Sequence, residues 1–199
     1  MKISGGLSNL AELIRFRLTA AVTLSAITGY FIHTTLAGIP LILLTAGIFL
    51  LAAGASALNQ YNERDQDRMM LRTRKRPLPR GKIKPVTALV VSLLFIASGM
   101  VLLLFIRPIT ASLGMLNVLL YNLVYTRLKK ITPLAVITGA AVGAIPPLIG
   151  FTAAGGSMPQ NEIILYSSFM FLWQLPHFWL ILVKYRVDYQ KAGFRTFSG

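Results

Sequence analysis

The sequence has no cysteine, few acidic residues and few charged residues of any kind. The absence of cysteine from all 199 residues excludes disulfide bonds, thiolate metal sites and cysteine nucleophiles. Charged residues make up only 13% of the chain, where a soluble domain has about a quarter, so an ordinary soluble fold is excluded. Hydrophobic residues make up 55%, which excludes intrinsic disorder. The composition is that of an integral membrane protein.

Six stretches are long and apolar enough to cross a membrane, which takes about 20 residues for a hydrocarbon core of about 30 Å. None of them contains Asp, Glu, Lys or Arg. They cover residues 18–36, 39–58, 86–106, 109–125, 133–154 and 163–183. We therefore predict an all-α fold, a polytopic transmembrane helical bundle with residues 1–199 forming one domain and a polar loop at 59–85.

The basic residues indicate the orientation of these spans. The chain has 20 Lys and Arg against 6 Asp and Glu, a net charge of +14 that would suggest nucleic acid in a soluble protein. Here every basic residue except Arg107 falls on the side of the N-terminus. Because basic loops stay in the cytoplasm, we expect both ends of the chain to be cytoplasmic. The charge is a topology signal, and no nucleic acid partner is expected.

A first polar cluster follows the second predicted span. Asn59, Glu63 and Asp67 are spaced four apart, which places them on one helical face at the membrane boundary. One amide oxygen and two carboxylates form a set of hard oxygen ligands suited to Mg²⁺. Arg72 and Arg76 follow, and guanidinium groups suit phosphate. The alternative is a solvated helix whose charges pair with one another or with anionic lipid.

A second polar cluster closes the sixth predicted span. Gln174, His177, Lys184 and Asp188 project within about 80° of one another on a helix. A polar stripe that begins inside the membrane is a hypothesis for a functional site, although a single His in a span often only bonds a neighbour. The two clusters are predicted to face each other across the bundle.

These residues resemble a known family. The pattern Asn59-x₃-Glu63-x₃-Asp67, followed by Arg72-Thr73-x₂-Arg76-Pro77, is similar to the first acidic motif of the UbiA-type intramembrane prenyltransferases. Three further stretches resemble the branch of that family that farnesylates heme: Tyr125-Thr126-x-Leu128-Lys129-Lys130, Gly143-Ala144-x-Pro146-Pro147, and Gln174-x-Pro176-His177-Phe178-Trp179 with Asp188-Tyr189-x₂-Ala192-Gly193.

The resemblance implies Mg²⁺-dependent transfer of a farnesyl group from farnesyl diphosphate to a vinyl group of heme b, which gives heme O on the way to heme A. It implies a catalytic site in the inner membrane in which Asn59, Glu63, Asp67 and Asp188 hold the metal ion. It also implies substrate binding by Arg72, Arg76, Gln174, His177 and Lys184. Heme b is then a substrate and not a cofactor, and a heme A synthase or an oxidase assembly factor is the expected protein partner.

Two features depart from the family pattern. The resemblance implies about nine membrane helices around a chamber open to lipid, whereas only six are predicted, so the chain is expected to be incomplete at its C-terminus. The second motif has Ala192 where the wider family has a second Asp.

Two other functions stay open: prenylation of an aromatic quinone precursor, and a role as half of a transporter whose polar clusters line a substrate path.

Overall fold

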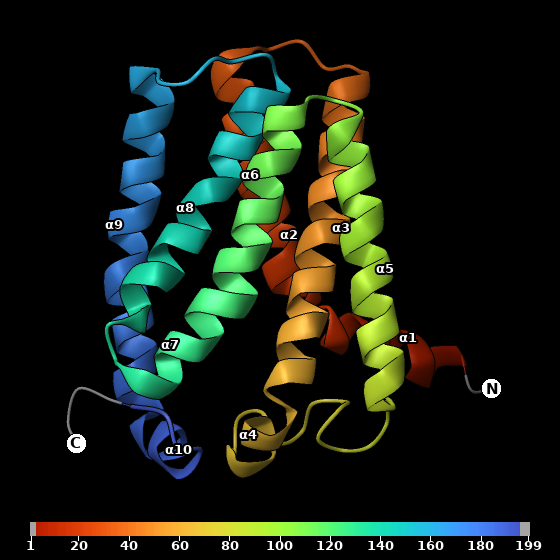
Figure 1. The fold of residues 1–199 in the computed structure, drawn as a ribbon, viewed down its shortest axis with the longest axis vertical. Helices are drawn as coiled ribbons and strands as arrows, with labels where there is room; N and C mark the ends of the chain where they lie inside the picture. The colour runs from red at the N-terminus through yellow and green to blue at the C-terminus, as the bar shows by residue number, and fades with distance from the viewer. Residues whose placement is uncertain (1–2, 196–199) are drawn as a thin grey trace.

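Six long helices lie side by side in the computed structural model, which describes residues 3–195 (Figure 1). The long helices are α2 (Phe16–His33), α3 (Ile39–Asn62), α5 (Pro85–Leu104), α6 (Pro108–Leu119), α8 (Ala135–Ala153) and α9 (Asn161–Lys184). A π-helical stretch, η1 (Leu120–Tyr125), and α7 (Thr126–Ile131) continue α6. The short helices are α1 (Ile3–Leu13), α4 (Arg64–Met69) and α10 (Arg186–Lys191). Every regular element in the described range is helical, which confirms the predicted fold class.

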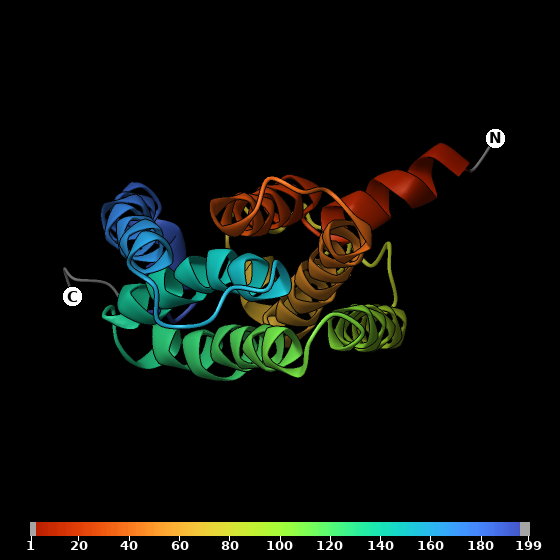
Figure 2. The same cartoon turned by 90° about the horizontal axis from the view of Figure 1, so that it is seen from above.

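Four of the helical stretches satisfy the length and hydropathy of a membrane span on their own: α3, α5, α8 and the continuous stretch Pro108–Ile131. The helices α2 and α9 are also long and lie beside the others, but their sequences are less apolar (Figure 2). Six membrane-crossing helices therefore agree with the arrangement of the bundle, and four of them are identified by composition.

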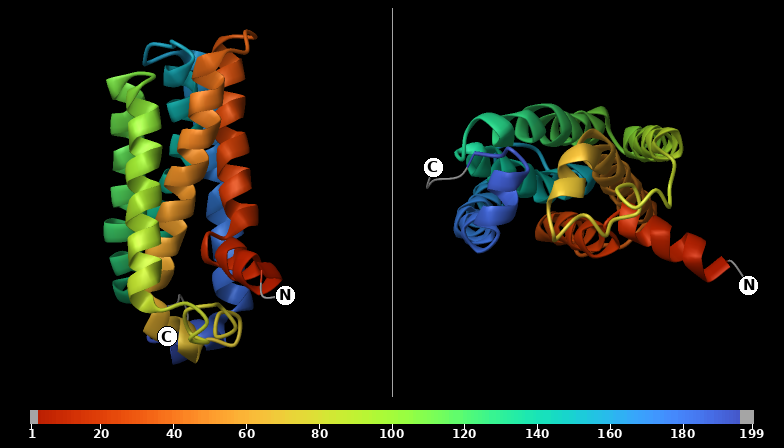
Figure 3. Two further views of the ribbon diagram at one scale, coloured as in Figure 1. Left: turned by 90° about the vertical axis from the view of Figure 1, so that its right-hand side faces the viewer. Right: turned by 90° about the horizontal axis from the view of Figure 1, so that it is seen from below.

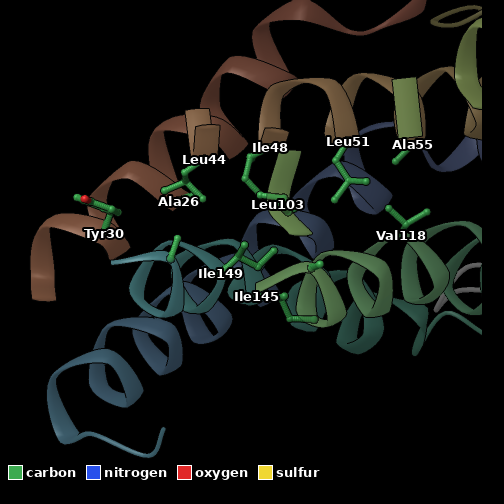
Figure 4. Close-up of a cluster of buried hydrophobic side chains, with 12 residues drawn as sticks. Ala26, Tyr30, Leu44, Ile48, Leu51, Ala55, Leu103, Val118, Ile145 and Ile149 are labelled. Atoms are coloured by element: carbon green, nitrogen blue, oxygen red, sulfur yellow. The ribbon is translucent and has the colours of Figure 1, made fainter. Parts of the chain in front are cut away.

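The helix α8 lies in the middle of the bundle, where it contacts α2, α6 and α9, and α3 joins α2 to α5. The main core cluster draws side chains from five of the long helices (Figure 4). Leu44, Leu103 and Ile149 are almost completely buried in it. Because lipid tails are as apolar as these side chains, the bundle is stabilised by close packing more than by removal of apolar surface from water.

Glycines allow the closest approach between α2 and α8. A methyl group added at Gly29 would overlap the carbonyl group of Pro147, and one added at Gly150 would overlap the carbonyl oxygen of Ala26. The two backbones therefore touch with no side chain between them, as small residues permit in membrane helices. This contact fixes α2, which forms one wall of the candidate site.

The two ends of the bundle differ. At one end lie α4, α7 and α10, together with the loop at 70–84 and the crosswise helix α1, which projects outward from the bundle (Figures 1 and 3). We call this the charged end. At the opposite end, here the far end, the connections between α2 and α3 and between α5 and α6 are short. The helices α3, α5 and α6 each begin with Pro in the first turn, where its missing N–H costs no hydrogen bond.

Candidate active site

A cavity of about 560 Å³ lies between α2, α3, η1, α8 and α9, with its charged lining residues at the charged end. Its apolar part is lined by aliphatic side chains such as Val22, Ile48, Leu51, Val118 and Ile149. The polar part is lined by the side chains of Arg15, Asn59, Glu63, Asp67, Arg72, Arg76 and Lys129. The cavity is therefore continuous from a charged region to an apolar region.

Three of the four predicted metal ligands, Asn59, Glu63 and Asp67, line the polar part of the cavity. The helix α3 ends at Asn62, and Glu63 departs from helical geometry with φ −108° and ψ 11°. The hydrogen bonds four residues apart nevertheless continue, because Glu63 N–H donates to Asn59 O (3.0 Å) and Asp67 N–H donates to Glu63 O (2.8 Å). Asn59, Glu63 and Asp67 are all almost fully buried and line the cavity. The predicted face is thus preserved across the break in the helix.

Each carboxylate of this group has a basic partner. The Arg76 guanidinium donates to both oxygens of Asp67, at 2.8 and 2.7 Å. Lys129 forms an ion pair with Glu63. Burial lowers the pKa of Arg76 and the neighbouring Arg15 adds to this, while Asp67 opposes it. Both acids are therefore neutralised within the protein.

The amide of Asn59 is also held on both sides. Its Oδ1 accepts a hydrogen bond from Arg15 at 3.1 Å, and its Nδ2 donates to Thr126 Oγ1 at 3.1 Å. A second N–H of Arg15 donates to the hydroxyl of Tyr121 at 3.2 Å. The contacts orient the amide so that its oxygen faces the basic side of the cavity.

The balance of charge in the cavity is positive. Four basic side chains line it (Arg15, Arg72, Arg76 and Lys129) against two acidic ones (Glu63 and Asp67). Charges that are fixed in a partly dry pocket interact more strongly than in water. An excess of two positive charges therefore makes this pocket suited to an anionic group such as a phosphate.

The two polar clusters predicted from the sequence do meet. The backbone N–H of Arg72 donates to Asp188 Oδ2 at 3.2 Å, and its guanidinium donates to the hydroxyl of Tyr189 at 3.2 Å. The same guanidinium lies over the ring of Tyr185, 4.9 Å from the centroid. The loop after α3 is thereby joined to the segment after α9 beside the cavity, which Arg72 and Tyr189 both line.

Two members of the second cluster are not brought to the cavity. No three His, Cys, Asp or Glu side chains converge on a possible metal position between residues 3 and 195, so the Asp188 carboxylate does not meet those of Glu63 and Asp67 in this structure, and its role as a ligand stays a prediction. Lys184 is exposed and lies over the ring of the adjacent Tyr185. For Asp188 the prediction assumed a continuous helix, whereas the chain leaves helical geometry at Tyr185, with φ −111° and ψ 23°.

Gln174 and His177 do line the cavity, as predicted. The amide of Gln174 lies against Gly143, where a methyl group would overlap it. The ring of His177 stacks on Trp173 with centroids 5.3 Å apart. Both side chains extend the polar lining from α9 along the wall opposite α3.

Three site residues were missed by the sequence reasoning: Arg15, Tyr121 and Lys129. The rule that basic residues stay in the cytoplasm accounts for Arg15 and Lys129 so well that no further role was assigned. One signal was present, because Tyr121, Tyr125 and Lys129 are spaced four apart at the end of a span. The structure places them on η1 and α7, and the rings of Tyr121 and Tyr125 stack at 5.9 Å. Short π-helical stretches are frequent at functional sites.

The chain matches known proteins along most of its length. Residues 18–198 match the model of the UbiA prenyltransferase family. A protoheme IX farnesyltransferase of Geobacter sulfurreducens is 43% identical over 186 residues, which are 94% of this chain and 69% of the relative. A protoheme IX farnesyltransferase of Christiangramia forsetii is 39% identical over 189 residues, which are 94% of this chain and 63% of the relative.

Solved structures share the fold. A digeranylgeranylglyceryl phosphate synthase superposes with a TM-score of 0.80 at 23% identity and covers 96% of this chain and 67% of its own. A UbiA homolog from Archaeoglobus fulgidus, bound to GPP and Mg²⁺, superposes with a TM-score of 0.78 at 20% identity, covering 93% of this chain and 66% of its own. This chain spans about two thirds of the length of the curated relatives that it matches.

Proposed function

Since this chain belongs to the UbiA prenyltransferase family, we propose that it transfers a farnesyl group from farnesyl diphosphate to a vinyl group of heme b, giving heme O. The most similar relatives reported above are protoheme IX farnesyltransferases, which supports heme as the acceptor. The lining of the cavity supports the same function independently of these relatives.

The observation that carries the proposal is the continuity of a positively charged pocket with an apolar one. Farnesyl diphosphate is an amphiphile of the same form, with an anionic head and a long apolar chain. Arg72, Arg76 and Lys129 supply donors for the head, and the aliphatic side chains between α2, α3 and α8 accept the chain.

The residues of the polar pocket also fit Mg²⁺. Asn59, Glu63 and Asp67 offer one amide oxygen and two carboxylates from successive turns of the chain, and diphosphate oxygens and water would complete the shell. When bound, the ion would neutralise charge on the leaving diphosphate. Arg76 and Lys129, which pair with the carboxylates here, are within the same pocket and would then be available to the diphosphate.

The reaction breaks the bond between the farnesyl carbon and the diphosphate oxygen. Arg72, Arg76 and Lys129 would bear the negative charge that develops on the diphosphate, in a pocket where these charges are already fixed. The vinyl carbon of heme b attacks the allylic cation, and water adds to the resulting cation to give the hydroxyethyl group. His177 and Gln174, on the wall opposite α3, are placed to hold the acceptor.

The orientation is part of the proposal. With α4, α7 and α10 in the cytoplasm, the charged end meets water-soluble Mg²⁺ and the far end lies at the opposite surface. The protein would then be a multi-pass protein of the inner membrane with a cytoplasmic N-terminus.

The product is too apolar to leave the bilayer, so we also propose direct transfer to a partner in heme A synthesis.

Product analysis tests the proposal. The chain, alone and joined to the C-terminal third of a full-length relative, is incubated in membranes with farnesyl diphosphate, Mg²⁺ and either heme b or an aromatic quinone precursor. Heme O, detected by mass, is the expected product, and it should disappear without Mg²⁺. A prenylated aromatic ring with no heme O would overturn the acceptor, and no transfer to either acceptor by the joined protein would overturn the reaction.

A further inference from the structure

The backbone of Arg15 adopts an unusual conformation. It connects α1 to α2 in the left-handed region, with φ 50° and ψ 55°, and it is the sole residue other than glycine with positive φ between residues 3 and 195. A side chain with a Cβ is disfavoured there, and such conformations persist only where the surroundings impose them. The corner between α1 and α2 is therefore held by specific contacts.

Gln60, the residue next to Asn59 on α3, supplies two of these contacts. Its side-chain amide is fully buried and donates to the carbonyl oxygens of Glu12 and Leu13, both at 2.8 Å. These are carbonyls of the last turn of α1, which have no partner within the helix. Gln60 thus ends α1 at a fixed position and makes the chain turn sharply at Arg15.

The turn directs the Arg15 side chain into the cavity. Two of its nitrogens bond Asn59 Oδ1 and the hydroxyl of Tyr121, whereas its buried Nε–H has no hydrogen-bond partner. A buried donor without a partner is costly in a finished site. An unpaired N–H donor is expected in a pocket that binds an anionic ligand, because the ligand would accept its hydrogen bond. Arg15 is among the residues that line the cavity.

We propose that Arg15 is a diphosphate-binding residue and that Gln60 is the positioning residue that holds it in the cavity. The inference rests on the proposed function, because it takes the anionic ligand to be the prenyl diphosphate. The ligand completes the hydrogen bonding of the guanidinium at Nε. The crosswise helix α1 becomes part of the active site, since its last turn determines where Arg15 points.

Direct binding of inorganic pyrophosphate with Mg²⁺, measured by calorimetry on the purified protein, tests Arg15 without turnover. Arg15→Ala and Arg15→Gly should each weaken binding by roughly 10- to 100-fold, the effect of a lost hydrogen bond to a charged group. Arg17→Ala is the matched control, because Arg17 is exposed two residues away and should bind as the wild type does. Since glycine tolerates positive φ, Arg15→Gly should melt at a higher temperature than Arg15→Ala.

Gln60 is tested through its dependence on Arg15. Gln60→Met keeps the size of the side chain but cannot donate to Glu12 and Leu13, so it should also weaken pyrophosphate binding. Combined with Arg15→Ala it should cause no further loss, because both changes remove the same guanidinium. Additive losses would overturn the positioning role. Wild-type affinity in both Arg15 variants would overturn the binding role alone, and no binding by the wild type would overturn the proposed function with it.

Discussion

The far end and the charged end of the bundle follow different structural rules. Towards the far end, α2, α3, α5 and α8 run as uninterrupted helices, and their contacts are made by glycines and aliphatic side chains. Even Pro146 and Pro147 lie inside α8 without ending it. Regular helices satisfy every backbone polar group internally, which is the strongest requirement within a membrane.

At the charged end, four helices lose their regularity close to one cavity. The interruptions fall at Arg15, Glu63, the η1 stretch and Tyr185. Three of them place a side chain of the cavity lining: Arg15 itself, Glu63 itself, and Tyr121 on η1. Regular helix packing at the far end therefore stabilises the bundle, whereas the irregular segments at the charged end position the side chains of the site.

The sharpest test of the charged end is removal of a carboxylate. Asp67→Ala and Glu63→Ala should each lower heme O formation at least about 100-fold, because they remove hard oxygen ligands and leave a buried base unpaired. The variants are assayed across a Mg²⁺ titration. Asp65→Ala is the matched control, since Asp65 is two-thirds exposed and pairs only with Arg64 and Arg68. Near-normal turnover by Asp67→Ala or Glu63→Ala would contradict the prediction that these carboxylates bind Mg²⁺.

The far end should respond in stability and not in chemistry. Gly150→Ala adds a methyl group where the carbonyl oxygen of Ala26 lies, so α2 and α8 must separate. We expect a loss of about 1 to 3 kcal/mol, measured as thermal unfolding in detergent, because overfilled contacts force the backbone to shift. Gly6→Ala is the control: nothing lies within 4 Å of the added group, and alanine favours the helix α1. Equal stability of the two variants would contradict the close contact.

Arginine and lysine should differ at the charged end. Arg76→Lys keeps the charge but loses the planar guanidinium, whose Nη1 donates to both oxygens of Asp67 and whose other nitrogens can donate to a phosphate, so turnover should fall about 10-fold while the protein stays folded. Heme O formation is compared with that of Arg74→Lys, a change at an exposed residue outside the cavity lining. If both variants match the wild type, Arg76 acts only as a topology charge.

The same division between the ends explains what the sequence could and could not predict. The spans were predictable because regular helices follow hydropathy, and the group of Asn59, Glu63 and Asp67 was predictable because hydrogen bonds four residues apart continue through Glu63. The predicted stripe reaches the cavity at Gln174 and His177 but does not continue to Asp188 in this structure, because projection at 100° per residue assumes a helix that stops at Tyr185. A break in a helix depends on tertiary contacts, and these are not visible in local periodicity.

Arg15 was missed for a related reason. Its left-handed backbone conformation costs about 1 to 2 kcal/mol and is favoured by nothing in the local sequence. It follows from Gln60, which lies 45 residues further along the chain and holds the last turn of α1. Such a contact can be read from a structure but not from composition or spacing.

The smallest effect is expected for Asp188→Asn. This variant distinguishes two roles for Asp188: a hydrogen-bond acceptor that holds the loop, or a metal ligand. In the structure the Asp188 carboxylate accepts the backbone N–H of Arg72, and an Asn side-chain oxygen can accept the same bond. If Asp188 only holds this loop, Asp188→Asn should keep turnover within about threefold and leave the Mg²⁺ requirement unchanged, because a neutral hydrogen bond contributes only about 1 kcal/mol.

Asp188→Ala, which removes the acceptor, should lose more activity than Asp188→Asn at the same Mg²⁺ concentration. A metal ligand would give the opposite pattern. Replacing a ligating carboxylate with an amide removes a negative charge, so Asp188→Asn would then need much more Mg²⁺ for half-maximal rate. Such a shift, with Asp188→Asn as impaired as Asp188→Ala, would show that the segment after Tyr185 moves when substrate binds and brings Asp188 to Glu63 and Asp67. The irregular end of the molecule would then have a second arrangement, and the ligand set implied by the family resemblance would hold in it.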